Sequence, residues 1–353
     1  MPFFSVDHVR LRGIAASLPE KKVSNRETGL FNEKEANLLI QTTGIEFRRI
    51  AGPEMTAADL CLAAAKKLLD ELNWKPAEVE VLLFVTQTPD YTVPGNSMIV
   101  QEALGIPDSC MCYDIIQGCA GFVYGLASLS SILSAGKLRK GLLLTGDTIS
   151  HTIAPADKAL LPVFSDAGSA LALESDSSAP QMHFSLNTRG AGRQAIHIPH
   201  GGARQPVTDK SLKTEVDEGG SERAPVHLHM NGLDVFNFGL NEVAADALKI
   251  LSITGSTVEE IDYFVMHQAN RLLNESIRRK TGIPAQKVPY SLGKSGNTSC
   301  ASIPVTMVSE ISTESKTRKL NLLLSGFGAG LSWGSAIVRT NKLVVPGMIE
   351  MGE

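Results

Sequence analysis

The sequence contains the same pattern twice, and this repeat constrains the fold more than any other feature. AEVEVLLFV around Val79 matches EEIDYFVMH around Ile261, and RKGLLLTG around Leu142 matches RKLNLLLSG around Leu322. GCAG at 118 likewise matches GNTS at 296, and GSALAL at 168 matches GSAIVR at 334. One match between short apolar strands is weak, but four in the same order, at offsets of 166 to 182 residues, are not expected by chance. We therefore predict two similar halves that face each other around a pseudo-twofold axis.

Each half alternates short apolar runs with longer segments of helical periodicity. The runs 79–88, 111–116 and 141–147 predict buried strands, whereas 57–72 and 122–133 place apolar residues at helical spacing. Strands separated by helices pair in parallel, which predicts an α/β architecture. The expected units are an N-terminal half at 1–180, a C-terminal half at 225–353 and a connecting loop region at 181–224.

The charge balance excludes several classes of partner. The 353 residues carry 33 basic and 37 acidic side chains, for a net charge of −4, so no strong basic field attracts nucleic acid or an anionic membrane. No run of 18 apolar residues is present, and we expect no membrane span. Apolar residues make up 43%, which argues against disorder.

The cysteines and histidines give no pattern of a disulfide framework or a metal site. Five cysteines are an odd number in a long chain, which favours free thiols and a reducing cytoplasm. Cys110 and Cys112 have no second pair at zinc-ligand spacing. The histidines at 197, 200, 227 and 229 lie in or next to a polar loop without a spaced carboxylate or thiol, so we expect no metal.

Cys119 is the strongest candidate for a nucleophile. In DIIQGCAGFVYGL a predicted strand ends near Ile116, Gly118 forms a turn and a helix begins near Ala120. The positive end of a helix favours a thiolate and lowers the pKa of a thiol, and a thiolate is a good acyl carrier. The alternative, that Cys119 is a small buried residue, is equally compatible with the local sequence.

His267 and Asn297 are candidates for a shared site with Cys119. His267 lies where an apolar strand ends and a helical pattern begins, a common place for ligands in α/β proteins. Asn297 precedes a helical pattern, after the same strand and turn that we expect before Cys119. A packed histidine and a helix-capping asparagine remain the alternatives for each residue alone. The repeat nevertheless brings all three to the junction of the halves.

Two further segments have a possible role in chemistry or binding. The glycine-rich segment 326–334 lacks the Lys-Ser/Thr of a phosphate-binding loop, so we expect a sharp turn whose N–H groups form an oxyanion hole. The predicted helix after His267 carries Arg271, Arg279 and Lys280. These side chains form either a solvated face or a docking site for an acidic carrier protein.

Taken together, the motifs resemble those of one family. They are TGIEFRRI (43–50), CAGF (119–122), SDAGSALAL (165–173), MNGLDVFNF (230–238), HQAN (267–270), GNTS (296–299) and GFGAGLSWGSAIVR (326–339). With these motifs the chain resembles, over nearly its whole length, the thiolase-like condensing enzymes, specifically β-ketoacyl-acyl-carrier-protein synthase III. The resemblance implies a duplicated five-layer αβαβα fold and a homodimer.

The resemblance also implies a mechanism. Cys119 takes an acyl group from a thioester such as acyl-coenzyme A, and malonyl-acyl carrier protein then binds. His267 and Asn297 stabilise the enolate that forms as carbon dioxide leaves, and its attack on acyl-Cys119 yields a 3-oxoacyl-carrier protein. The N–H groups of Cys119 and Ala329 hold the oxyanion, and no cofactor is needed. Implied substrate contacts are Val93, Gly232, Phe236, Asn270 and Phe327, and implied carrier contacts are Arg271, Arg279 and Lys280.

Several positions depart from the family pattern. Leu38 and Thr42 stand where the family has a Trp and an Arg that enclose the coenzyme A adenine. Lys158 and Leu272 replace two further arginines. We therefore expect a donor other than acetyl-coenzyme A, carried on coenzyme A or on a carrier protein. Val93 replaces a Phe that ends the acyl tunnel, which predicts tolerance of longer or branched acyl groups.

Two other functions remain open from the sequence. The first is an acyltransferase on the same scaffold that passes the acyl group from Cys119 to an alcohol or an amine. The second is a non-catalytic subunit of a heteromeric synthase, although such subunits have usually lost one of the three site residues, and Cys119, His267 and Asn297 are all present.

Overall fold

The computed structural model describes residues 2–352 and contains two large sheets. The first sheet has the order β17 (Ile349–Met351), β2 (Val9–Pro19), β8 (Ala167–Ser175), β7 (Lys140–Asp147), β5 (Val81–Thr86) and β6 (Met111–Ile116). The second has the order β1 (Phe3–Val6), β9 (Met182–Thr188), β16 (Ser332–Thr340), β15 (Leu320–Gly328) and β14 (Tyr263–Met266). Three two-stranded sheets pair β3 (Lys22–Ser24) with β4 (Phe47–Arg49), β10 (Ile196–His197) with β13 (His229–Met230), and β11 (Glu215–Val216) with β12 (Glu222–Arg223).

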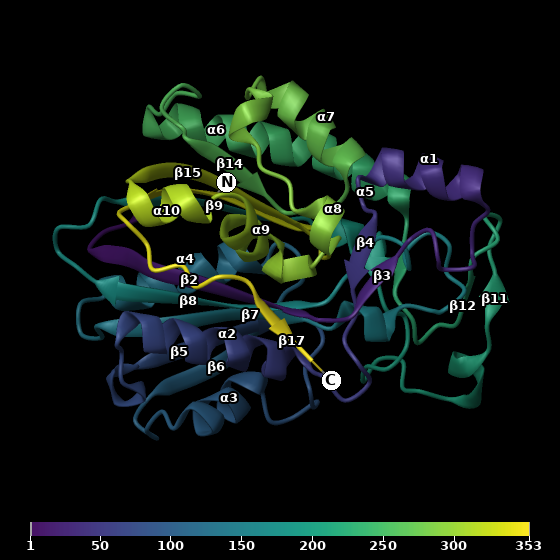
Figure 1. The fold of residues 1–353 in the computed structure, drawn as a ribbon, viewed down its shortest axis with the longest axis horizontal. Coiled ribbons are helices and arrows are strands. Elements are labelled where there is room, and N and C mark those ends of the chain that lie inside the picture. The colour runs from purple at the N-terminus through teal and green to yellow at the C-terminus, as the bar shows by residue number, and fades with distance from the viewer. Residues whose placement is uncertain (1, 353) are drawn as a thin grey trace.

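The helices lie on both outer faces of the sheets and between them. They are α1 (Glu33–Thr43), α2 (Ala57–Leu72), α3 (Asn96–Leu104), α4 (Gly121–Ser134), α5 (Gly232–Phe238), α6 (Ala244–Thr254), α7 (Arg271–Thr281), α8 (Leu292–Ser295), α9 (Ser302–Glu310) and α10 (Ser312–Thr317). Figure 1 shows α6 and α7 over the second sheet, α4 and α9 between the sheets, and α2 and α3 below the first sheet. The predicted five-layer α/β arrangement is therefore present.

The two sheets share one pattern of strand pairing, which confirms the repeat. In the first sheet β5 pairs parallel with β7, β7 antiparallel with β8, and β8 antiparallel with β2. In the second sheet β14 likewise pairs parallel with β15, β15 antiparallel with β16, and β16 antiparallel with β9. One detail differs from the sequence match. Leu142 pairs with Leu82, but the corresponding Leu322 pairs with Tyr263 rather than Phe264, so the match around Val79 is out by one residue.

The apolar strand runs are continuous because both faces of each sheet are covered. In β5, Leu83 faces the core between the sheets, whereas Leu82 faces α2 and α3. In β15, Leu322 faces the same central core and Leu323 faces the outer layer of α6 and α7. Alternate side chains are thus buried in different layers, and burial of both sets stabilises the five-layer stack.

The connecting region differs from the expected loop. Its first residues form β9, a central strand of the second sheet, so the second half begins within 181–224. The ends of the chain also cross between halves, because β1 joins the second sheet and β17 joins the first. None of the helices within residues 2–352 is long and apolar enough to cross a membrane.

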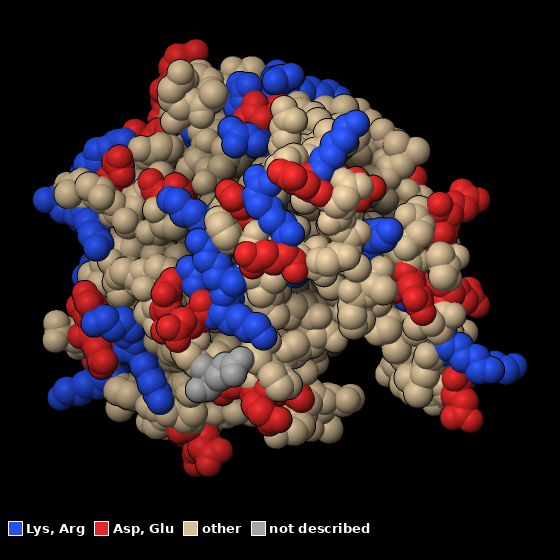
Figure 2. Space-filling model, turned by 45° about the vertical axis from the view of Figure 1, so that its right-hand side comes forward, with Lys and Arg blue, Asp and Glu red and all other residues tan. Residues whose placement is uncertain are grey.

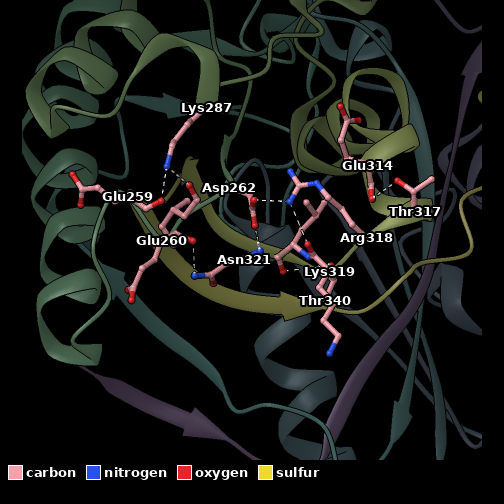
Figure 3. Close-up of polar contacts among 12 residues, drawn as sticks. Glu259, Glu260, Asp262, Lys287, Glu314, Thr317, Arg318, Lys319, Asn321 and Thr340 are labelled. Atoms are coloured by element: carbon pink, nitrogen blue, oxygen red, sulfur yellow. Dashed lines mark hydrogen bonds and ion pairs between the residues drawn. The ribbon is translucent and has the colours of Figure 1, made fainter.

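Polar contacts fix the amino ends of β14 and β15 (Figure 3). Lys287 Nζ donates hydrogen bonds to three main-chain carbonyl oxygens in the segment 258–261, at 2.6 to 2.9 Å. The Asp262 carboxylate accepts from Arg318 Nη1 at 2.6 Å and from the Asn321 N–H at 2.7 Å. Because both strands start here, the residues that follow them emerge together at the opposite edge of the sheet, where His267 and Ala329 lie.

Candidate active site

Cys119 lies between β6 and α4, at the carboxyl edge of the first sheet. Its side chain is 9% exposed, and Gly328 of the second half packs directly against it. A Cβ atom on Gly328 would lie 2.8 Å from Cys119 Cβ and 3.2 Å from Sγ. Only glycine fits at this approach, so the end of β15 and the candidate nucleophile are in contact across the two halves.

The expected lowering of the Cys119 pKa is not found. Burial, opposed by the Ser299 hydroxyl and reinforced by the Asp147 carboxylate, raises the pKa of Cys119 to about 12. The N–H groups at the start of α4 are not all free as predicted, because the Gly121 N–H already donates to the Gly118 carbonyl at 2.7 Å. Desolvation of the thiolate therefore outweighs the helix end, and the thiol is protonated at neutral pH.

His267 is the first residue after β14 and is buried. Its Nδ1 lies 2.7 Å from Ser302 Oγ, and the Phe327 ring packs edge-on at 5.2 Å. The Ser302 hydroxyl also accepts the Gln268 N–H at 3.3 Å, and its own proton is available to His267 Nδ1. With Ser302 as the donor to Nδ1, the proton of the neutral imidazole is on Nε2. Burial lowers the pKa of His267 to about 3, so the ring is neutral.

Asn297 is buried beside the strand-end segment that carries His267. Its Nδ2 donates to the Ala269 carbonyl at 3.4 Å, and its Oδ1 accepts the Ser299 N–H at 3.0 Å. The expectation that a strand precedes Asn297 is wrong, because the single-turn helix α8 stands there. Pro289 lacks an N–H for a strand ladder, which disfavours the strand at this point.

Ser299 connects the three candidate residues. Its hydroxyl lies 3.7 Å from Cys119 Sγ, its N–H bonds to Asn297, and its backbone contacts the His267 ring. Ser299 is fully buried and has a φ of 49°, a left-handed conformation that is uncommon for a residue with a side chain. Ser299 is the last residue of the GNTS motif, but its residue type and position in the sequence do not predict a role.

A buried polar cluster extends behind Ser299. Gln87 Nε2 donates to Ser299 Oγ at 3.1 Å, and the Gln87 N–H donates to the Asp147 carboxylate at 2.8 Å. The Gln87 amide also explains Gly118, because a Cβ there would lie 2.5 Å from Gln87 Oε1. Asp147 ends β7, and its place at a carboxyl strand edge was the only sequence signal for a functional position.

Two comparisons with known proteins identify the family. Residues 113–190 match the family model described as 3-oxoacyl-[acyl-carrier-protein (ACP)] synthase III, and residues 251–340 match the C-terminal model of the same family. The β-ketoacyl-[acyl-carrier-protein] synthase III of Streptococcus uberis is 33% identical over 92% of this chain and 97% of its own length. The chain belongs to the 3-oxoacyl-[acyl-carrier-protein] synthase III family. The corresponding protein of Caldanaerobacter subterraneus is 30% identical over 94% of this chain and 97% of its own.

Solved structures of synthase III proteins have the same fold. The 3-oxoacyl-(acyl-carrier protein) synthase of Burkholderia xenovorans LB400 superposes with a TM-score of 0.94, at 34% identity, over 99% of both chains. The predicted family, thiolase-like fold and acyltransferase class are thereby confirmed for this synthase III.

The other predicted substrate residues lie around this centre in different settings. Gly232 begins α5 and is exposed, and Phe236 on the same helix is partly buried. The Asn270 side chain caps α7 by accepting the Leu273 N–H at 2.9 Å. Phe327 contacts His267, whereas Val93 is 80% exposed on the described chain. Ala329 begins the turn between β15 and β16, directly after Gly328.

The predicted carrier-docking residues of this synthase III lie along α7. Arg271 stacks over the Tyr290 ring at 5.6 Å, and Lys280 Nζ donates to Asn241 Oδ1 at 2.9 Å. Arg279 is exposed, with a side chain 77% accessible. In Figure 2, Lys and Arg side chains lie at the top of the molecule, where Figure 1 places α7, and there as on the rest of that face they alternate with Asp and Glu.

The departures from the family pattern lie at the surface. Leu38 on α1 is 64% exposed and Leu272 on α7 is 52% exposed, while Thr42 and Lys158 are also exposed. Helices α1 and α7 contact each other, and the Arg271 side chain packs against Gly44 at the end of α1. No group of three His, Cys, Asp or Glu side chains among residues 2–352 is arranged to hold a metal ion.

Proposed function

We propose that this synthase III catalyses two successive acyl transfers that end in a decarboxylative condensation. Cys119 takes the acyl group of a thioester, and malonyl-acyl carrier protein then accepts it to give a 3-oxoacyl-carrier protein and carbon dioxide. The contact of Ser299 with Cys119, Asn297 and the His267 ring carries the proposal. It joins a nucleophilic thiol to a neutral imidazole and an amide in one buried site.

The first transfer uses Cys119 and the turn after β15. The sulfur attacks the thioester carbonyl, and the tetrahedral oxyanion binds the N–H groups of Cys119 and Ala329. The close packing of Gly328 against Cys119 supports this assignment, because Ala329 is the next residue in the chain. Donors held in place for a developing oxyanion contribute much of the rate enhancement in such reactions.

The second transfer uses His267 and Asn297. Loss of carbon dioxide from the malonyl group leaves an enolate, whose oxygen needs hydrogen-bond donors rather than a base. The neutral His267, with its proton on Nε2, and the Asn297 amide are both donors. The site is buried, which protects the carbanion from protonation by water before it attacks acyl-Cys119.

The substrates, the carrier and the assembly are part of the same proposal. The acyl donor arrives on coenzyme A or on a carrier protein, and the basic side chains of α7 bind the acidic carrier. The residues assigned above perform both transfers without a cofactor. All five cysteines are unpaired, which fits the cytoplasm.

A homodimer is supported by the free edge of the first sheet. Strand β6 has a neighbour on one side within residues 2–352, and its Met111, Tyr113 and Ile116 side chains are exposed. An unpaired apolar edge strand favours pairing with a second chain. Val93 is exposed in the single chain, but in the proposed dimer it would contact the acyl chain bound to the partner subunit.

One experiment tests the proposal. The purified protein is mixed with acyl-coenzyme A and acyl-carrier donors, and intact mass spectrometry detects an adduct on Cys119, with Cys119→Ala as control. Malonyl-carrier protein is then added, and carbon dioxide and the 3-oxoacyl product are measured. We expect both the adduct and the product. An adduct without carbon dioxide release favours acyl transfer to another acceptor, and no adduct with any donor rules out a covalent mechanism.

A further inference from the structure

A chain of polar contacts leads from Cys119 into the first half of the molecule. Cys119 Sγ lies 3.7 Å from Ser299 Oγ. The Ser299 hydroxyl is in turn close enough to the Asp147 carboxylate to lower the pKa of that carboxyl as a hydrogen-bond donor, against the larger effect of burial. Gln87 binds both ends of this chain, since its side chain donates to Ser299 Oγ and its N–H donates to Asp147. With Gln87 Nε2 as the fixed donor to Ser299 Oγ, the serine is free to accept the thiol proton and donate its own to Asp147.

Asp147 is a fully buried carboxylate that no mechanism step above uses. Its Oδ1 accepts from Thr86 Oγ1 at 2.9 Å and from Thr88 Oγ1 at 3.1 Å, and Cys300 Sγ lies 3.3 Å from Oδ2. No Lys, Arg or His side chain in the described part of the chain forms an ion pair with it. A buried carboxylate without a cation is costly, and it is a ready acceptor for a proton.

We propose that Asp147 takes the proton of Cys119 through the hydroxyl of Ser299 and holds it while Cys119 carries the acyl group. This inference rests on the proposed function, because it concerns the same nucleophile. Ser299 contacts the reacting sulfur, whereas Asp147 is a positioning residue that acts through Ser299.

The proton balance of the cycle is complete. The S–H bond of Cys119 breaks, Ser299 accepts that proton and passes its own to Asp147, and the sulfur forms a bond to the acyl carbon. Coenzyme A leaves as a thiolate and takes a proton from the solvent. When the enolate attacks acyl-Cys119, the C–S bond breaks and Cys119 becomes a thiolate again. Asp147 then returns the proton through Ser299.

The charge of the buried site explains why this route is favoured. Release of the Cys119 proton to solvent leaves a thiolate beside a carboxylate, two buried charges of the same sign. Transfer to Asp147 moves one negative charge from oxygen to sulfur and adds none. The neutral Asp147 also removes a charge that would repel the malonyl carboxylate and the enolate.

The titratable groups around Asp147 are the thiols of Cys61, Cys119 and Cys300, with Asp90 further away beside Cys61. Burial raises the pKa of the Cys61 thiol and that of the Cys300 thiol well above their usual values, so neither thiol titrates near neutral pH. Burial likewise raises the pKa of Asp147 from its usual value, which favours acceptance of a proton.

The test is the pH dependence of Cys119 alkylation by iodoacetamide, followed by intact mass on the full chain. With the relay, Cys119 and Asp147 together carry one negative charge throughout this pH range. The fraction of Cys119 in the thiolate form is then constant, so the wild-type alkylation rate is the same from pH 7 to pH 9. In Ser299→Ala and Asp147→Asn the proton must go to hydroxide. The rate then falls at least ~100-fold at pH 7 and rises about tenfold per pH unit.

A faster alkylation rate in Asp147→Asn would support a different role for Asp147. If Asp147 acts only through its charge, Asp147→Asn lowers the Cys119 pKa and alkylation at pH 7 becomes faster than in the wild type. That result overturns the relay. Ser299→Gly, which accepts the positive φ, repeats the Ser299 test if Asp147→Asn does not fold.

Thr88→Val is the matched control, since it removes a different hydrogen bond to the same carboxylate and leaves the Cys119–Ser299–Asp147 path intact. We expect a level profile from it, and a profile like that of Ser299→Ala would overturn the proposal. Alkylation needs neither an acyl donor nor a carrier protein. Failure of the condensation assay and failure of the relay are therefore separate results.

Discussion

The thiol of Cys119 in the first half lies 3.7 Å from the hydroxyl of Ser299 in the second half. Cys119 precedes α4 and Ser299 precedes α9, and the two residues belong to different halves. Their contact therefore exists only because α4 and α9 pack the two halves together. The geometry of the candidate site therefore depends on close packing between the halves, and small additions of volume at that junction are expected to affect activity strongly.

Gly328→Ala tests this dependence. The added Cβ would lie 2.8 Å from Cys119 Cβ, so either the β15 turn or Cys119 must move. We expect a loss of about 1–3 kcal/mol in the free energy of unfolding and at least a tenfold slower acylation of Cys119. Gly347→Ala is the control, because no heavy atom lies within 4 Å of its added Cβ. Equal rates for both variants would show that the contact is not critical.

His267→Asn tests the protonation state of the imidazole through stability. The His267 pKa is about 3 in the folded protein and near 6.5 when unfolded, so below pH 6.5 the unfolded chain binds the extra proton. His267 therefore contributes stability above pH 6.5 that is lost as the pH falls toward 3. Between pH 7 and 5 the wild type should lose about 2 kcal/mol more than the variant, measured by urea unfolding at each pH. His183 and His229 are present in both proteins, so their contributions cancel.

Val93→Phe tests the acyl-chain prediction. Val93 is 80% exposed in the single chain. In the proposed homodimer, its small side chain would leave room for a long acyl group in the partner's site. We expect a larger loss of kcat/KM with long donors than with acetyl or propionyl donors. Equal losses across the series would count against a role for Val93 in chain length.

Local sequence predicted the layers well because burial in a sheet is a property of short runs. The run 111–116 coincides with β6, although this edge strand is not buried in the described chain as predicted, because nothing covers its free side. The helical segment 57–72 coincides with α2. The repeat was visible because both sheets use the same strand order. The match of Val79 with Ile261 is out by one residue because both faces of these strands are buried. Apolar residues then follow one another without alternation, so the sequence does not fix the alignment to a single residue.

The electrostatics of the site were not predictable in the same way. The start of α4 suggested a low Cys119 pKa, but burial by residues distant in sequence reversed the direction. Asp147 and Ser299 are separated by about 150 positions and become neighbours only when the halves pack. Residue types and motif spacing predict Cys119, His267 and Asn297 as site residues, whereas the groups that surround them depend on tertiary contacts.

Charge reversal on α7 tests carrier docking. Arg279 is exposed and Lys280 is held by a single contact to Asn241, so both are available to an acidic partner. Arg278 is a poor choice, because its guanidinium bonds to Glu275 and to the Ile283 carbonyl and so supports the helix end. We expect the Arg279→Glu, Lys280→Glu double variant to raise KM for malonyl-carrier protein about tenfold and to leave acylation by acyl-coenzyme A within twofold.

Lys319→Glu is the matched control for this prediction. Lys319 directly precedes β15, whereas Ala329 follows it, so the two residues lie at opposite ends of a nine-residue strand. Lys319 also lies beside the contacts in Figure 3, in the segment between α10 and β15 and not on α7. The docking effect should weaken with added salt, because exposed charges more than about 10 Å apart are screened at 0.1 M. A similar rise in KM from Lys319→Glu would mean that net charge, rather than α7, governs carrier binding.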